Sequence, residues 1–461
     1  MTPDRIGCAA ACVALTVVAS GFSRTLQAPA KSFSVVEATI PDMRRAMDEG
    51  RVTSRELVVQ SLTRLALYEK KINAAIAVNA HALADAEALD AERARGRIRG
   101  PLHGIPIAVK DNIQTTDMPT TGGALAFAGF VPPYEATLIT NLKNAGAVVI
   151  AKTVLTELAN WVAGAPTPMP GNYTAVAGFA FNPYDPRPDP REANNDGRPV
   201  LSTGGSSSGA GTAASFWAAN VGTDTSGSVV NPAQLSMLVG IRPTTGRISR
   251  WGIIPITADQ DTAGPMARTV ADAAILLGGI ESPSPDPNDA ATNRCTPPPQ
   301  RDYTPHLKRD GLRGARIGIP RAFYYDRLTP PTENNPRGGL NDAQAKLMAE
   351  AIEIVKREGA VVVDPANLPS VLDPDPSEKR SAVGHVFRRQ SGQGQGRQLH
   401  VGPEVRHEAR LQCLGEDDRR ARAREVADRA AHFQHDAHAR QRDPLRPVES
   451  RHLRRARRRA R

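Results

Sequence analysis

The stretch "GGSSSGAGTAASFWAANVGTDTSGS" (204–228) contains serines that could act as nucleophiles. A flexible Gly/Ser linker lacks large apolar residues, whereas this stretch is interrupted by "AASFWAANV". We expect the middle part to form a helix followed by a short strand, so that the two Ser/Gly clusters become turns at its ends. The sequence therefore predicts a structured site that holds a serine hydroxyl in place.

A serine nucleophile needs a neighbouring base, and two kinds of base are open. "GSSSG" (205–209) matches G-x-S-x-G, which would make Ser207 the nucleophile of an α/β-hydrolase. That mechanism needs an acid and then a histidine downstream, and before residue 376 only His306 follows. A lysine is the alternative, because burial lowers its pKa and leaves it able to accept a proton. Lys110 ends the apolar stretch "GIPIAVKDNI", although a single lysine at a strand end often extends into solvent.

The elements that would position these residues alternate between helix and strand. Apolar residues at three-to-four spacing predict helix over residues 35–100, with a capping signal at Thr53 and Glu56 and a stop at Gly96. "GIPIAVKDNI" and "GARIGIP" predict strands, and "TVADAAILLGGI" predicts a helix. "ATLITNLKNAGAVVIAKTV" and "NDAQAKLMAEAIEIVKREGAVVVDPANLP" each predict a helix, a glycine and a strand. This alternation predicts an α/β fold in which helices flank a mixed central sheet.

Charge is distributed unevenly along the chain. The formal net charge is +10, but residues 376–461 hold 22 Lys and Arg against 11 Asp and Glu, and also seven of the ten histidines. The body of the chain is therefore not basic, and we expect no nucleic-acid partner for it. The tail has no sustained apolar period, so we expect it to be disordered or to result from an out-of-frame stretch. A basic tail that binds nucleic acid or anionic lipid is the alternative.

The N-terminus has the layout of a secretory signal peptide. Arg5 precedes an apolar run from Ile6 to Val18, and Ala28-Pro29-Ala30 follows as a cleavage signal. We expect residues 1–30 to be removed and the protein to be periplasmic or secreted, with no membrane span in the mature chain. Cys295 and Cys413 would remain, too few for a disulfide framework, and no Cys/His spacing is typical of a metal site.

Five motifs in order resemble the amidase signature family, and most of all its peptide-amidase-like bacterial members. They are "GIPIAVKDNI", "GGSSSGAGTAAS", "GTDTSGSVVNPA", "GIRPTTGRIS" and "DTAGPMARTVADAA". The resemblance covers roughly residues 35–375, and together with the composition it divides the chain into a signal peptide (1–30), a catalytic domain (31–375) and the tail (376–461).

The resemblance implies hydrolysis of a linear carboxamide, on a small molecule or a peptide, through an acyl-enzyme and without a cofactor or metal. Carried over by motif, the catalytic residues are Lys110, Ser206 and the nucleophile Ser228, with Ser206 relaying the proton. Backbone N–H groups of Thr225, Ser226 and Gly227 would bind the oxyanion, since successive N–H groups of a turn converge on one oxygen. We expect Asp224 to hold this loop rather than to act as an acid.

Two departures from the family leave alternatives open. The spacing from Ser206 to Ser228 is two residues shorter than is usual, and the family's C-terminal segment is not visible after residue 375, so we expect a catalytic domain incomplete at its C-terminal end. An inactive homologue is therefore one alternative. The amidase subunit of a tRNA-dependent amidotransferase, which would need partner subunits, is another. Val229 and Val230 follow Ser228 where many family members have an arginine, which favours a less charged pocket.

Overall fold

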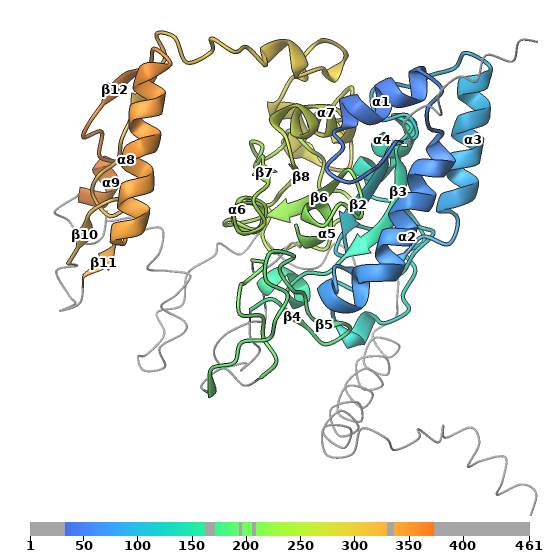
Figure 1. The fold of residues 1–461 in the computed structure, drawn as a ribbon, viewed down its shortest axis with the longest axis horizontal. Coiled ribbons are helices and arrows are strands. Elements are labelled where there is room, and N and C mark those ends of the chain that lie inside the picture. The colour runs from blue at the N-terminus through green and yellow to red at the C-terminus, as the bar shows by residue number, and fades with distance from the viewer. Residues whose placement is uncertain (1–32, 162–170, 193–195, 205–208, 330–335, 373–461) are drawn as a thin grey trace, which may run out of the picture.

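The protein is built around one six-stranded sheet with helices on both faces (Figure 1). The computed structural model describes residues 33–161, 171–192, 196–204, 209–329 and 336–372. The strand order is β1-β3-β2-β6-β8-β7. This confirms the predicted α/β class with a mixed central sheet.

Three neighbouring strands at the centre of the sheet run parallel: β2 (Pro106–Lys110), β3 (Val148–Thr153) and β6 (Ala219–Asp224). All three are buried along their whole length, as expected for β-branched strands covered on both faces. Lys110 is paired in register with Thr153, and Val109 with Val221. The carboxyl ends of these strands therefore meet at one edge, which is where open α/β sheets bind ligands.

The remaining strands of this sheet are antiparallel to their neighbours. β8 (Thr262–Ala267) pairs with β6, and the two-residue β7 (Val239–Gly240) pairs with β8. β1 (Ala75–Val78) pairs with β3 at the opposite edge. The prediction that the helical region of residues 35–100 includes Ala75–Val78 is therefore wrong. Asn73, in a left-handed conformation at φ 51°, ends the helix before it, and the small apolar residues that follow it join the sheet.

The N-terminal helices have the predicted caps. They are α1 (Ile40–Asp48), α2 (Ser54–Ile72) and α3 (Ala82–Ala94). Thr53 and Glu56 form a capping box at the start of α2, as predicted. Gly96, at φ 76°, follows α3 where the sequence predicts a stop.

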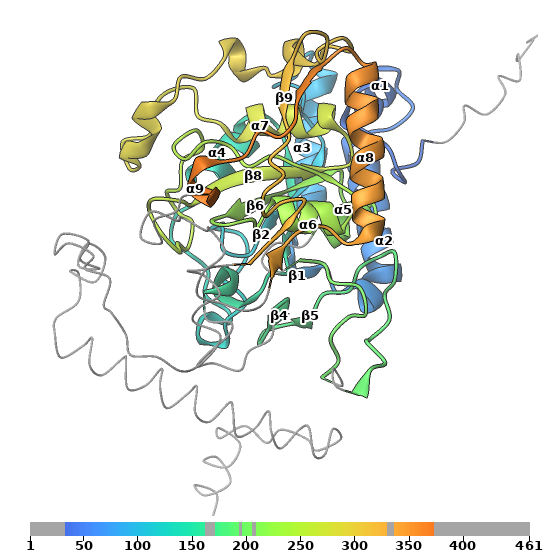
Figure 2. The same ribbon diagram turned by 90° about the vertical axis from the view of Figure 1, so that its left-hand side faces the viewer.

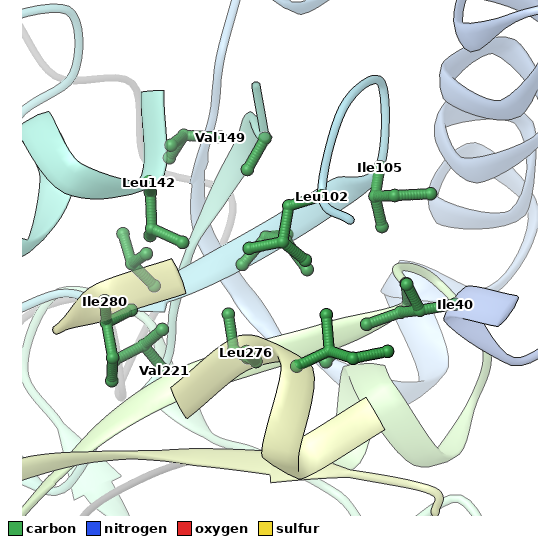
Figure 3. Packing of buried hydrophobic residues seen from close by; sticks show 14 of the residues in the cluster. Ile40, Leu102, Ile105, Leu142, Val149, Val221, Leu276 and Ile280 are labelled. Atoms are coloured by element: carbon green, nitrogen blue, oxygen red, sulfur yellow. The ribbon is translucent and has the colours of Figure 1, made fainter. Parts of the chain in front are cut away.

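Two apolar clusters cover the two faces of the sheet. The larger joins α1, α4 (Thr137–Asn144) and α7 (Val270–Ile280) to β2, β3 and β6, and Figure 3 shows Ile40, Leu142, Leu276 and Ile280 converging on it. The smaller cluster joins α2, α3 and the short α5 (Ala210–Ala213) to the other face, with Phe216 and Trp217 fully buried. Burial of these side chains is the main stabilising contribution to the layer arrangement.

A second small unit follows the main sheet in the sequence. α8 (Asp342–Arg357) packs on the two-stranded parallel sheet of β9 (Arg316–Gly318) and β12 (Val361–Val363), as the helix–glycine–strand pattern predicts (Figure 2). The other short helices are α6 (Val230–Leu235) and α9 (Pro369–Leu372), and the other short strands are β4 (Tyr173–Thr174), β5 (Gly178–Phe179), β10 (Arg327–Leu328) and β11 (Arg337–Gly338). The 3-10 helices among the described residues are Leu125–Phe127, Glu157–Asn160, Ala290–Arg294, Pro299–Arg301 and Thr304–His306.

Within the described ranges, no helix combines the length and the apolar character needed to cross a membrane. The predicted signal peptide (1–30) and the basic tail (376–461) lie outside the described residues.

Candidate active site

Lys110 lies fully buried at the carboxyl end of β2. Its Nζ donates hydrogen bonds to the Thr223 hydroxyl at 2.7 Å and to the Thr223 carbonyl at 3.3 Å. Burial lowers the pKa of Lys110 to about 7, against the charges of Asp224 and Asp261, which raise it. A large fraction of this lysine is therefore neutral near pH 7, as a general base must be. The alternative of a lysine extended into solvent is wrong.

Thr223 connects Lys110 to a second polar side chain. Asn112 Nδ2 donates to the Thr223 hydroxyl at 3.0 Å and to the Ile254 carbonyl at 3.3 Å. Two donors thus converge on one hydroxyl oxygen at the end of β6. This arrangement fixes the position of the Lys110 amine, because a buried donor without its acceptor would be costly.

Asp224, the last residue of β6, organises the turn that leads to Ser228. Its buried carboxylate accepts hydrogen bonds from the backbone N–H of Gly227 at 2.8 Å and of Val229 at 2.7 Å. Arg242 Nε donates to the same carboxylate at 3.0 Å. The prediction that Asp224 holds the loop is confirmed.

Gly227 adopts φ 117°, a conformation that favours glycine and lets the turn close between Asp224 and Ser228. Its N–H is directed to Asp224, so in this structure Gly227 shapes the loop. The oxyanion role assigned to Thr225, Ser226 and Gly227 stays a prediction. Ser228 itself is partly buried, and Val229 separates it from α6.

Gly204 and Gly209, at the two ends of the first Ser/Gly cluster, pack against α6 and the residue after it, and α6 follows the second cluster. A Cβ on Gly204, which has φ 87°, would lie 2.7 Å from Pro232 Cα in α6. A Cβ on Gly209 would lie 3.0 Å from the Ser236 hydroxyl, just after the same helix. Ser206 lies outside the described residues, but the glycines on both sides of it contact the segment that follows Ser228.

Comparison with known proteins agrees with this geometry. The model of a family described as Amidase matches residues 56–373. The chain belongs to the amidase family.

Its relatives include a peptide amidase and subunits of glutamyl-tRNA(Gln) amidotransferases. A glutamyl-tRNA(Gln) amidotransferase subunit from Chloroflexus aurantiacus is 38% identical over 331 residues, which are 71% of this chain and 60% of that protein. The native peptide amidase of Stenotrophomonas maltophilia is similar with a TM-score of 0.62 at 36% identity, covering 77% of this chain and 68% of that one. A glutamyl-tRNA(Gln) amidotransferase subunit from Thermotoga maritima gives a TM-score of 0.54 at 26% identity, covering 78% and 70%. The chain spans about 60% of the length of the first sequence relatives it matches.

A second buried lysine was not identified from the sequence of this amidase-family chain. Lys152 on β3 lies 3.4 Å from the Asp111 carboxylate, and both side chains are fully buried. Burial lowers the pKa of Lys152 to about 8 and raises the pKa of Asp111. Lys152 also donates to the Thr120 hydroxyl at 2.7 Å, and Asp111 accepts from the Thr121 hydroxyl at 2.5 Å. The pair thus connects the end of β2 to the turn after it. The sequence does contain a signal for a buried Lys152, because "VVIAKTV" has an apolar run followed by a lysine, as "IPIAVKD" does.

His103, the buried histidine of the described residues, has a backbone contact of its own. His103 is buried with its Nε2 3.0 Å from the Leu89 carbonyl, as expected for a structural residue, and burial lowers its pKa. Within the described ranges, no three His, Cys, Asp or Glu side chains gather closely enough to hold a metal ion.

Proposed function

We propose that this chain hydrolyses a linear carboxamide to a carboxylate and ammonia through an acyl-enzyme, with Lys110, Ser206 and Ser228 as the catalytic residues. The observation that carries the proposal is the fully buried Lys110, whose pKa is lowered to about 7 and whose amine is held at the end of β6. That strand leads through Asp224 into the turn that contains Ser228. A neutral lysine next to a nucleophile loop supplies the base that amide attack by serine requires.

The proposed reaction uses these three residues in turn. Neutral Lys110 takes the proton of Ser206, which takes the proton of Ser228 as its Oγ attacks the amide carbonyl. The tetrahedral oxyanion is stabilised by backbone N–H groups of Thr225 and Ser226, because the Gly227 N–H already donates to Asp224. The C–N bond then breaks, and the amine leaves as ammonia with the proton returned through Ser206. Water, deprotonated by the same relay, attacks the acyl-Ser228 ester and releases the carboxylate.

A second candidate is the amidase subunit of a tRNA-dependent amidotransferase. It is favoured by the relatives that are named as amidotransferase subunits, at 36–38% identity. In that case ammonia would be passed to a partner subunit instead of being lost to solvent. The two functions differ in an assay without partners: a free-standing amidase hydrolyses simple primary amides, whereas the subunit function depends on added partner subunits and tRNA.

The test of the catalytic assignment is the release of ammonia from primary amides by the full chain and by Ser228→Ala. We expect Ser228→Ala to abolish both turnover and labelling by a serine-reactive fluorophosphonate. Ser284→Ala, at an exposed serine away from the site, is the control and should behave as the original protein. Labelling that survives in Ser228→Ala and disappears in Ser207→Ala would contradict the assignment and favour the G-x-S-x-G mechanism. Absence of turnover and of labelling in the original chain would favour the inactive homologue.

We also propose that the protein is exported and that its tail is not part of the catalytic unit. Export is supported by the apolar run from Ile6 to Val18 and the Ala28-Pro29-Ala30 signal. Expressed in a bacterium, the mature protein should begin near residue 31 by intact-mass measurement, and an intact Met1 would contradict export. Trypsin should remove residues 376–461 before it cleaves the sheet, and a protected tail fragment would contradict the proposal for the tail.

A further inference from the structure

A cavity of about 280 Å³ lies beside the end of β6. It is surrounded by the end of β6, by the segment 250–258 and by residues near Asp289. The described residues that line it include Asn112, Thr223, Thr225, Trp251, Ile254 and Ile256.

The cavity borders the groups that hold the proposed base. Thr223 accepts the hydrogen bond of the Lys110 amine, and Asn112 donates to the same hydroxyl. Thr225 begins the turn that leads to Ser228, and it also lines the cavity. A substrate whose amide reaches this turn therefore has the cavity next to it.

The wall formed by residues 251–256 is largely apolar. The Trp251 ring stacks on Tyr134 with 5.3 Å between the ring centroids, which fixes its orientation. Ile253, Ile254 and Ile256 also line the cavity, and the backbone N–H of Ile254 donates to the Asn112 carbonyl at 2.9 Å. The apolar wall and the polar groups at the end of β6 are thus held together by direct hydrogen bonds.

The charged groups in the cavity wall are engaged by the protein itself. Arg250 makes a two-pronged ion pair with Asp289, with distances of 2.8 Å from Nε to Oδ2 and 2.5 Å from Nη2 to Oδ1. Asp261 accepts hydrogen bonds from the Thr225 hydroxyl at 2.6 Å and from the backbone N–H of Ile256 at 2.8 Å and Thr257 at 3.0 Å. An anionic substituent in this cavity would lose its hydration, would lie near the Asp261 carboxylate and would find Arg250 already paired with Asp289, and this disfavours it.

We propose that this cavity is the subsite for an uncharged, apolar substituent of the substrate, so that the preferred substrates are primary amides with an aromatic or branched aliphatic group close to the amide. The inference rests on the proposed function and adds a substrate class to it. A cavity of about 150 Å³ accommodates benzene, so 280 Å³ accommodates a phenyl ring with its linking carbons.

The test compares kcat/KM for 3-phenylpropanamide, propanamide and glutamine with the full chain. Burial of the phenyl ring should raise kcat/KM for 3-phenylpropanamide about tenfold to a hundredfold over propanamide, and glutamine, with its charged groups, should be the poorest substrate. Ile254→Ala and Ile256→Ala should each reduce the ratio of 3-phenylpropanamide to propanamide about tenfold. Ile317→Ala, a partly buried isoleucine on β9, is the matched control and should leave the ratio unchanged.

Binding to the inactive variant separates this inference from the proposed function. In Ser228→Ala, calorimetric titration with 3-phenylpropanamide should give binding that Ile256→Ala weakens about tenfold. If Ser228→Ala shows such binding and the original chain hydrolyses no amide, the subsite would be supported and the hydrolase function overturned. Turnover that is equal for glutamine and 3-phenylpropanamide, or a ratio that Ile254→Ala and Ile256→Ala leave unchanged, would overturn the subsite while the hydrolase function stands.

Discussion

The pH dependence of turnover should follow the protonation of Lys110. Its pKa is lowered from the usual 10.5 to about 7 because the amine is fully buried. At about 1.4 kcal/mol per pKa unit, this net shift corresponds to about 5 kcal/mol against the charged form, after the carboxylates of Asp224 and Asp261 have offset part of the cost of burial. Since only the neutral amine accepts a proton, kcat/KM should rise with pH around a midpoint near 7 and fall about tenfold per unit below it.

Removing one of the two opposing charges tests the cause of the shift. The charge of Asp261 raises the pKa of Lys110, so Asp261→Asn should move the midpoint to lower pH. Asp259→Asn is the matched control, since Asp259 is an exposed carboxylate two residues away that is not among the causes of the shift. The assay is kcat/KM for propanamide from pH 5 to 10, measured by ammonia release.

Three results would refute this reasoning. A midpoint near 10 would mean that Lys110 keeps the pKa of a solvated lysine. A midpoint that Asp261→Asn leaves in place or moves upward would mean that the carboxylate does not act on the titrating group. A midpoint near 8 that disappears in Lys152→Met would assign the titration to the other buried lysine, whose pKa is lowered to about 8.

Three further predictions concern stability and positioning. Lys110→Met should raise the free energy of unfolding, and by more at pH 6 than at pH 9. The pKa of Lys110 is about 7 in the folded protein and 10.5 in the unfolded chain, so the original chain loses stability as pH falls from 10.5 towards 7. Equal gains in denaturant titrations at both pH values would contradict this. Thr223→Val removes the hydroxyl acceptor of the Lys110 amine and keeps the carbonyl acceptor. It should lower kcat with little change in KM and shift the pH midpoint, whereas Thr223→Ser should restore both; loss of activity that Thr223→Ser does not rescue would indicate a merely structural role. Arg242→Met removes a donor to the Asp224 carboxylate, so the turn should be misplaced and kcat should fall by up to about a hundredfold. The far-UV spectrum should be unchanged, and an unchanged kcat would contradict the prediction that Asp224 holds the turn.

The sequence predicted those parts of the fold in which local pattern and tertiary environment agree. The strand ending at Lys110, the helix–glycine–strand unit before Thr153 and the capping box at Thr53 are all found. Each has a continuous apolar run or a cap whose hydrogen bonds are local. The segment "NAAIAV" was missed as a strand because its small apolar residues suit both helix and strand, and only pairing with β3 decides between them.

β8 was not predicted as a strand for a different reason. Its centre contains Gly264 and Pro265, which are unfavourable inside a sheet. Gly264 is required there, because a Cβ would lie 2.0 Å from the Ile241 carbonyl. In the candidate site, Lys110 and the Asp224 loop were identified from the sequence, whereas the Thr223 contact and the Lys152–Asp111 pair depend on strand register, which the local pattern does not specify.

The contact between Lys110 and Thr223 joins residues 113 positions apart in the chain, and it forms only when β6 has inserted beside β2. Closing such a long loop costs entropy before any contact repays it, so pairing of this kind is slow during folding. Helices α2 and α3 contact each other directly and need far less chain to be brought together. In a refolding experiment, recovery of helical signal should therefore precede recovery of turnover. A protein that has regained its secondary structure would still lack a competent base until the centre of the sheet has closed.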